Sequence, residues 1–162
     1  MRRIGITGHQ GLGRATAALV AAALQETLER GGPALGITSL AEGADQLFAE
    51  AVLKNGGSIF AVIPAAGYER SFEDPSAVHR YHVLRERADE VLELDYREPG
   101  EQAYWAAGQK VVELCDQLLA VWDGQPAGGL GGTADVVAFA REQGKPVSVI
   151  WPAGARRDAG GG

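Results

Sequence analysis

Cysteine, aromatic residues and long apolar runs are all scarce in this chain of 162 residues. Cys115 is the single cysteine, so no intramolecular disulfide can form, and one thiol beside three histidines offers no metal-ligand spacing. We therefore expect no zinc site and no other metal. No apolar run approaches the roughly 18 to 20 residues that span a bilayer, and Met1 to Arg3 precede only a short apolar stretch rather than a signal-peptide core. These absences predict a cytoplasmic protein that has no membrane partner.

Basic residues are also fewer than acidic ones: the chain has 15 Lys and Arg and 21 Asp and Glu, which gives a formal net charge of -6. That balance repels a polyphosphate backbone unless the arginines gather on one face, which argues against double-stranded nucleic acid as a partner. With 46% hydrophobic and 22% charged residues, the composition fits one globular domain. We assign residues 1–152 to this domain and residues 153–162 to a disordered tail.

Short segments rich in β-branched residues alternate with longer amphipathic segments along the chain. The predicted strands are 4–7, 34–39, 59–63, 91–94, 118–122 and 147–151. This alternation predicts an α/β fold, in which helices cover both faces of a mainly parallel sheet of about six strands, a three-layer α/β/α sandwich. The segment 91–94 has a half-polar second face and is expected at an edge of the sheet, whereas 118–122 has no polar face and is expected in the centre.

Glycine is abundant, with 23 residues, and it gathers in three loops that each follow a predicted strand, at 8–13, 39–45 and 123–133. Because the carboxyl ends of parallel strands lie along one edge of a sheet, we expect these loops to meet there. Each loop also leads into a helix, whose first amides and positive dipole end favour an anion. The sequence therefore predicts one site for a phosphate-bearing ligand, although a tight turn or a helix cap explains each loop taken singly.

Two segments within these loops resemble known elements. Residues 39–49, SLAEGADQLFA, are similar to the S-G-x-A-x-G-x-D-x-x-A element of DprA-like Rossmann domains. Gly131-Gly132-Thr133 resembles the G-G-x-G-T element of the LOG and lysine-decarboxylase-like proteins, which are joined with DprA in the SLOG superfamily. The order of elements, with Asp123-Gly124 after a strand, also looks like the YpsA branch. The resemblance covers residues 3–151 and implies a Rossmann-like pocket for a nucleoside monophosphate or an ADP-ribose-like molecule.

The residues that we predict to bind the ligand come from the three loops. The resemblance implies that Gly8, Ser39, Gly43 and Asp45 line the pocket and that Gly131, Gly132 and Thr133 hold phosphate. From their positions around the first turn we add His9, Gly11 and Arg14, because an imidazole or a guanidinium at a strand end can meet a phosphate. For Asp45, stabilisation of a helix dipole remains an alternative role, as solvation does for His9.

Carboxylates at the same strand ends suit the cleavage of an N-glycosidic bond, whose oxocarbenium-like transition state a carboxylate stabilises while an acid protonates the leaving base. The candidates at these strand ends are Glu42, Asp45, Asp123 and Asp135, of which we assign the catalytic role to Glu42, Asp123 and Asp135. A turn role for Asp123 and a helix-dipole role for Asp135 remain alternatives. LOG enzymes, which release a base from a nucleoside monophosphate, carry glutamate three places after the threonine; Val136 stands there in this chain, so that reaction does not follow from the resemblance.

Three functions remain open at this point. The first is a nucleotide-binding module, for instance a sensor, and the second is a hydrolase or transferase that acts on the N-glycosidic bond of a nucleoside or nucleotide. The third, single-stranded DNA binding by analogy with DprA, is disfavoured by the net charge of -6. The partner expected is a nucleotide-like small molecule; no separate cofactor is expected, and a homodimer is compatible with the domain size. Tyr68 and Phe72 belong to a loop that either covers the pocket or packs on the surface, and Tyr104 is expected in the core or at a subunit contact.

Overall fold

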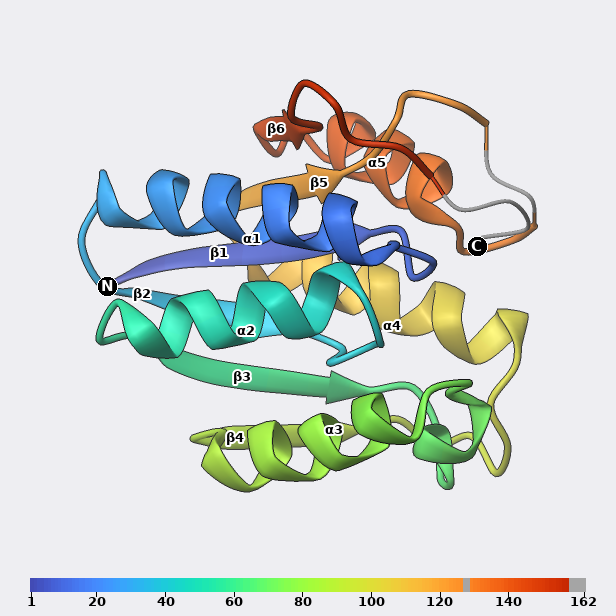
Figure 1. Ribbon diagram of the computed structural model, residues 1–162. Helices are drawn as coiled ribbons and strands as arrows, with labels where there is room; N and C mark the ends of the chain where they lie inside the picture. The colour runs from blue at the N-terminus through green and yellow to red at the C-terminus, as the bar shows by residue number, and fades with distance from the viewer. Residues whose placement is uncertain (127–128, 158–162) are drawn as a thin grey trace.

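Six strands, all parallel, form one sheet in the order β4-β3-β2-β1-β5-β6 within the described part of the chain. The structure is a computed structural model that describes residues 1–126 and 129–157 (Figure 1). Its elements are β1 (Arg2–Gly8), α1 (Arg14–Glu29), β2 (Ala34–Thr38), α2 (Ala44–Lys54), β3 (Ser58–Ile63), the 3₁₀ turn η1 (Tyr68–Ser71), α3 (Pro75–Arg87), β4 (Glu90–Glu93), α4 (Glu101–Leu114), β5 (Gln117–Val121), α5 (Thr133–Glu142) and β6 (Val147–Ile150).

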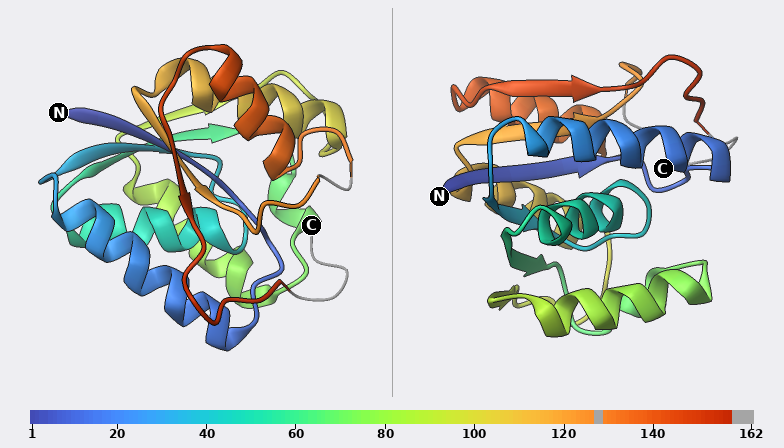
Figure 2. Two further views of the ribbon diagram at one scale, coloured as in Figure 1. Left: turned by 90° about the horizontal axis from the view of Figure 1, so that it is seen from above. Right: turned by 60° about the vertical axis from the view of Figure 1, so that its left-hand side comes forward.

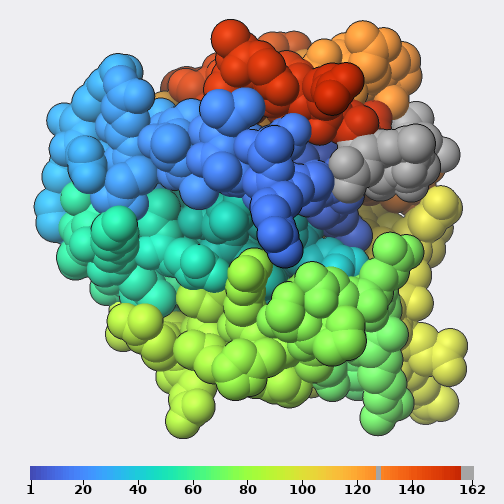
Figure 3. All heavy atoms as spheres, viewed as in Figure 1, coloured from blue at the N-terminus to red at the C-terminus, as the bar shows by residue number. Residues whose placement is uncertain are grey.

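Helices cover both faces of the sheet, which confirms the predicted three-layer α/β/α sandwich (Figure 2). Helices α1, α2 and α3 lie on one face, and their side chains fill the surface seen in Figure 3 from the blue α1 to the green α3. Helices α4 and α5 lie on the other face, where Val111, Val136 and Ala140 pack in a second core cluster against the sheet. Within the described residues, no helix is long and apolar enough to cross a membrane.

Two strand glycines set how closely the helices approach the sheet. A Cβ on Gly36 would lie 2.8 Å from Val52 Cγ2 of α2, and one on Gly5 would lie 2.9 Å from Val111 Cγ1 of α4. These distances are too short for a real side chain, so the strands carry glycine where α2 and α4 rest directly on the backbone. Helix α1 instead buries Val20, Leu24 and Leu28, which recur every four residues on one face.

The strand order places a topological switch point between β1 and β5. From β1 the chain continues to β2, β3 and β4 on one side of the sheet, and β5 and β6 then add on the other side. As predicted, β4 lies at an edge and β5 lies inside the sheet, between β1 and β6. The crevice beyond the carboxyl ends of β1 and β5 is where open parallel sheets bind ligands.

The chain beyond β6 returns across the start of α1. The hydroxyl of Thr16 donates to the carbonyl oxygen of Arg156 at 3.0 Å and accepts from its amide at 2.9 Å, and Arg157 forms an antiparallel bridge with Leu12. Residues 153–157, which we assigned to a tail, therefore have defined contacts with the domain. The rest of that segment, 158–162, lies outside the described residues.

Candidate functional site

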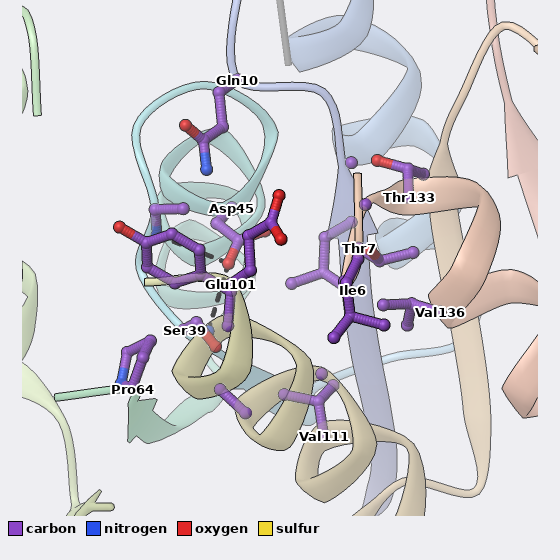
Figure 4. Close-up of a pocket in the computed structure, with 18 of the residues that line it drawn as sticks. Ile6, Thr7, Gln10, Ser39, Asp45, Pro64, Glu101, Val111, Thr133 and Val136 are labelled. Atoms are coloured by element: carbon purple, nitrogen blue, oxygen red, sulfur yellow. Dashed lines mark hydrogen bonds between the residues drawn. The ribbon is translucent and has the colours of Figure 1, made fainter. Parts of the chain in front are cut away.

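A cavity of about 460 Å³ opens beyond the carboxyl ends of β1 and β2, and α4 and α5 form two of its walls (Figure 4). All three glycine-rich loops reach it, through Gly8 at the end of β1, Ser39 after β2, and Gly131 before α5. The loops therefore meet in one place, as the predicted strand arrangement required. Pro64, which follows β3, also lines the cavity.

The amino end of α5 forms one wall of this cavity. Gly132 is the N-cap and has no side chain to satisfy the first-turn amides, which lack acceptors within the helix. Gly131 has a φ of +82°, and a Cβ there would lie 2.9 Å from the Trp105 amide nitrogen, so both its conformation and its close approach to α4 require glycine. Asp135 accepts from the Gly131 amide at 3.1 Å and does not line the cavity. Its carboxylate holds the turn, while the helix end faces the cavity.

The β2–α2 loop is held by the carboxylate of Asp45, across the cavity from Thr133 (Figure 4). Asp45 Oδ2 accepts from the amide of Ser39 at 3.1 Å, from the amide of Ala41 at 3.4 Å and from the hydroxyl of Thr38 at 3.3 Å. Burial raises the pKa of Asp45 to about 7, although these hydrogen bonds act in the opposite direction. The amides of this loop are thus occupied by the protein's own side chain rather than open to a ligand.

Glu42 lies outside the main cavity. Its carboxylate accepts from the amides of Glu73, at 3.1 Å, and Asp74, at 3.4 Å, and so ties the β2–α2 loop to the residues before α3. Glu42, Gly11 and Gly43 line a separate polar depression of about 370 Å³. This placement differs from the common site that we predicted for these three residues, because the β1–α1 loop passes directly over Gly43, whose Cβ would lie 2.5 Å from a loop carbonyl oxygen.

His9 and Asp123 form a buried contact behind the cavity. His9 is 2% exposed, and its Nε2 accepts from the amide of Asp123 at 3.1 Å and lies 3.2 Å from Asp123 Oδ1. Burial opposes the ionisation of Asp123, but the Gln125 amide, His9 and Arg157 outweigh it and lower the pKa of this carboxyl. Neither His9 nor Asp123 lines the cavity, whereas Arg157, whose Nη1 lies 3.8 Å from Asp123 Oδ2, does.

Six of the predicted residues are thus brought together at the cavity: Gly8, Ser39, Asp45, Gly131, Gly132 and Thr133. Arg14 is exposed at the first residue of α1 and lines neither hollow. None of the three carboxylates that we predicted for catalysis lines the main cavity.

Several cavity residues were missed in the sequence. Glu101 begins α4 and lines the cavity together with Tyr104, one turn later. The Tyr104 ring lies 6.3 Å from that of Tyr68, which in turn packs on Phe72 at 5.0 Å and Tyr81 at 5.6 Å. Tyr104 is therefore part of the cavity wall as well as of an aromatic cluster. The signal in the sequence that could have identified Glu101 and Tyr104 was their place at the start of a predicted helix.

No protein-family model matches the sequence, and a search of curated proteins finds no match. Solved structures share its fold. DNA processing protein A (DprA) from Streptococcus pneumoniae superposes with a TM-score of 0.70 at 21% identity, covering 94% of this chain and 51% of that one. DprA from Helicobacter pylori, described for its single-stranded DNA binding mode, gives 0.65 at 17% identity over 96% of this chain and 68% of that one.

A third similar structure is the molybdenum cofactor binding protein from Rippkaea orientalis, with a TM-score of 0.57 at 17% identity over 93% of this chain and 77% of that one. The chain spans about half the length of the Streptococcus pneumoniae protein. At these identities the likeness shows the fold. It confirms the Rossmann-like architecture and, at the level of fold, the resemblance to DprA-like domains.

Proposed function

We propose that this protein binds a phosphate-bearing, nucleotide-like small molecule in the main cavity, with the anionic group at the amino end of α5. The observation that carries the proposal is the sequence Gly131-Gly132-Thr133, which presents a helix end without a side-chain cap to a cavity of about 460 Å³. Ligand pockets for small molecules usually measure roughly 300 to 1,000 Å³, so a nucleotide suits this volume.

Groups that can bind an anion are part of the cavity lining. The first-turn amides of α5 carry the positive end of the helix dipole, and the buried Thr133 adds a hydroxyl beside them. The guanidinium of Arg157 reaches the same cavity from the segment after β6, with 23% of its side chain exposed. Amides, hydroxyl and guanidinium are the groups that proteins use to bind phosphate.

The remaining lining of the cavity suits the organic part of the ligand. Tyr68 and Tyr104 contribute aromatic surface to the lining, and Ile6, Ala107 and Val111 contribute apolar surface. Aromatic rings packed in a cluster are rigid surfaces against which a flat base can stack. Among proteins of this fold, one is named for the molybdenum cofactor and another is described for single-stranded DNA, so both kinds of ligand occur on it.

The three carboxylates assigned to catalysis have structural partners, whereas Asp45 and Glu101 are, among the described residues, the acidic ones that line the cavity. Glu42 and Asp135 hold backbone amides, and Asp123 holds the Gln125 amide and contacts His9 and Arg157. Each of these acids has a structural partner and lies outside the cavity lining. If the protein is an N-glycosidic hydrolase or transferase, as the sequence also suggested, these three residues do not contact the ligand from the cavity lining.

The test is a charge placed at the helix end. Gly132 has φ -69° and ψ 172°, which any residue adopts, so aspartate at this position should cap α5 and leave the fold intact. Its carboxylate would repel a bound phosphate and should weaken the binding of ADP-ribose or AMP at least tenfold by calorimetry. Gly132→Ser is the matched control, because its neutral hydroxyl also caps the helix, and it should keep affinity within a few-fold of the original.

Equal affinity for Gly132→Asp and the original protein would contradict the proposed site. Chromatography of the same mixtures distinguishes binding from cleavage, because a free base in the products would favour the hydrolase. A labelled single-stranded oligonucleotide gives the third arm of the experiment. Binding that weakens steeply with salt would instead indicate a DNA-binding surface.

A further inference from the structure

The two oxygens of the Asp45 carboxyl group have different surroundings. Oδ2 accepts all three hydrogen bonds from the β2–α2 loop and its strand. Oδ1 makes no hydrogen bond with any residue in the ranges 1–126 and 129–157. Because Asp45 lines the main cavity with 6% of its surface exposed, Oδ1 is the carboxyl oxygen left for a ligand.

The charges that face Asp45 do not compensate a negative charge on it. Glu42 belongs to the same loop, and Glu101 contributes a second carboxyl group to the same cavity from α4. Tyr68 and Tyr104 are the other titratable neighbours; burial first, and the charge of Asp45 second, raise the pKa of Tyr68. Arg157 also lines the cavity, but its guanidinium contacts Asp123. No ion pair joins Asp45 to a basic side chain in the described chain.

An ionised Asp45 would therefore be a buried carboxylate without a counter-ion, in the cavity proposed to receive an anion. Removing a carboxylate from water costs several kcal/mol when no opposite charge is near. A bound phosphate raises that cost further, because like charges repel strongly in a closed site of low dielectric constant. The neutral acid avoids both costs, since its hydroxyl can donate a hydrogen bond to the ligand.

We infer that the ligand is bound with Asp45 as a neutral carboxylic acid, whose Oδ1–H donates to an acceptor atom on the anionic ligand. This inference rests on the proposed function and specifies its ligand class: an anion that offers a hydrogen-bond acceptor at the Asp45 end of the cavity. Above the pH at which free Asp45 ionises, the carboxylate takes one proton from solvent when the complex forms. No bond in the ligand breaks.

The experiment is calorimetry with ADP-ribose across pH 6 to 9, where its diphosphate stays fully ionised and cannot itself cause a pH dependence. Above neutral pH the affinity should fall about tenfold per pH unit, because the protonated fraction of Asp45 falls tenfold per unit. Titrations at pH 8 in two buffers that differ in ionisation enthalpy should show the uptake of about one proton per ligand.

Asp45→Asn tests the same inference, because asparagine mimics the neutral carboxylic acid. The asparagine oxygen can replace Oδ2 at the loop amides, and its NH₂ group places a permanent donor where Oδ1–H would lie. We expect its affinity to be independent of pH and, at pH 8, to exceed that of the original protein about tenfold. Asp116→Asn is the control: Asp116 is an exposed partner of Arg3 at the start of β5, so its removal should leave the pH slope in place.

Three results would overturn the inference. They are equal pH slopes for the original protein and Asp45→Asn, no proton uptake at pH 8, or affinity that rises with pH. If Asp45→Asn fails to fold, the proton uptake of the original protein still decides the question. A protein that binds no ADP-ribose or AMP at any pH overturns the proposed function itself, whereas binding with a flat pH profile overturns only the role of Asp45.

Discussion

Replacing Asp45 with asparagine should stabilise the protein at pH 8 and leave its stability nearly unchanged at pH 4. Burial raises the pKa of Asp45 from its ordinary value of 3.8 to about 7. The folded state therefore binds more protons than the unfolded state between these values. The contribution of Asp45 to stability is therefore highest below about pH 4, decreases as pH rises, and levels off above about pH 7. Each pKa unit corresponds to about 1.4 kcal/mol, so ionised Asp45 costs up to about 4 kcal/mol, which asparagine does not incur.

Urea denaturation of both proteins at pH 4, 5, 6, 7 and 8 measures this difference. Other carboxyl groups titrate too. Hydrogen bonds from Ser76 lower the pKa of Asp74, and hydrogen bonds from Arg3 lower the pKa of Asp116. The stability that each of these two groups contributes is lost as the pH falls through its pKa in the folded state. These contributions are the same in the two proteins and cancel in the difference. The unfolding free energy of Asp45→Asn minus that of the original should rise with pH. A difference that stays constant from pH 4 to 8 would refute the argument that burial keeps Asp45 protonated.

Two further predictions concern the frame around the site. Gly43→Ala should destabilise the fold by more than about 2 kcal/mol in thermal denaturation, because Gly43 has a φ of +91° and its Cβ would lie 2.5 Å from Gln10 O. Gly56→Ala, with a similar φ of +79° but no atom nearer than 3.8 Å, is its control and should cost only about 1 kcal/mol; equal losses would contradict the role of close approach. Thr16→Val removes both hydrogen bonds to Arg156 and should speed amide hydrogen exchange in residues 153–157 while α1 stays protected. Unchanged exchange there would show that the segment is held by other contacts.

The fold could be predicted from the sequence because the pattern of polar and apolar residues in each strand indicates how deeply the strand is buried. Leu118 to Val121 carry no polar face and lie inside the sheet, whereas Glu90 and Glu93 mark the exposed strand β4. The start of α3 is harder to place from the sequence, because both Asp74 and Ser76 are residue types that cap helices; Asp74 is the N-cap and accepts from the Ser76 amide. Pro75 explains why Asp74 is the cap, because its fixed φ suits the first helical position.

The site was only partly predictable, because the same acidic residue in the first turn of a helix serves either a ligand or the backbone. Asp45 and Asp135 both lie in the first turn of their helices, α2 and α5, and both accept hydrogen bonds from amides of the preceding loop. Their difference is one of depth: Asp45 lines the cavity and Asp135 does not. Nor could local patterns find Arg157, which reaches the cavity through a segment whose bonds to α1 join residues 140 positions apart.

Close packing explains why the proposed anion site uses one of the three glycine-rich loops rather than all three. A Cβ on Gly8 would lie 2.5 Å from Ala44 Cβ, and one on Gly43 would meet Gln10, so these glycines allow the first two loops to pack on each other. The Ser39 and Ala41 amides are then closed by Asp45. Gly132, by contrast, has an ordinary backbone conformation and stands at a helix end on the cavity wall. The amino end of α5 is therefore where we propose that the phosphate binds, and Gly132→Asp tests that position directly.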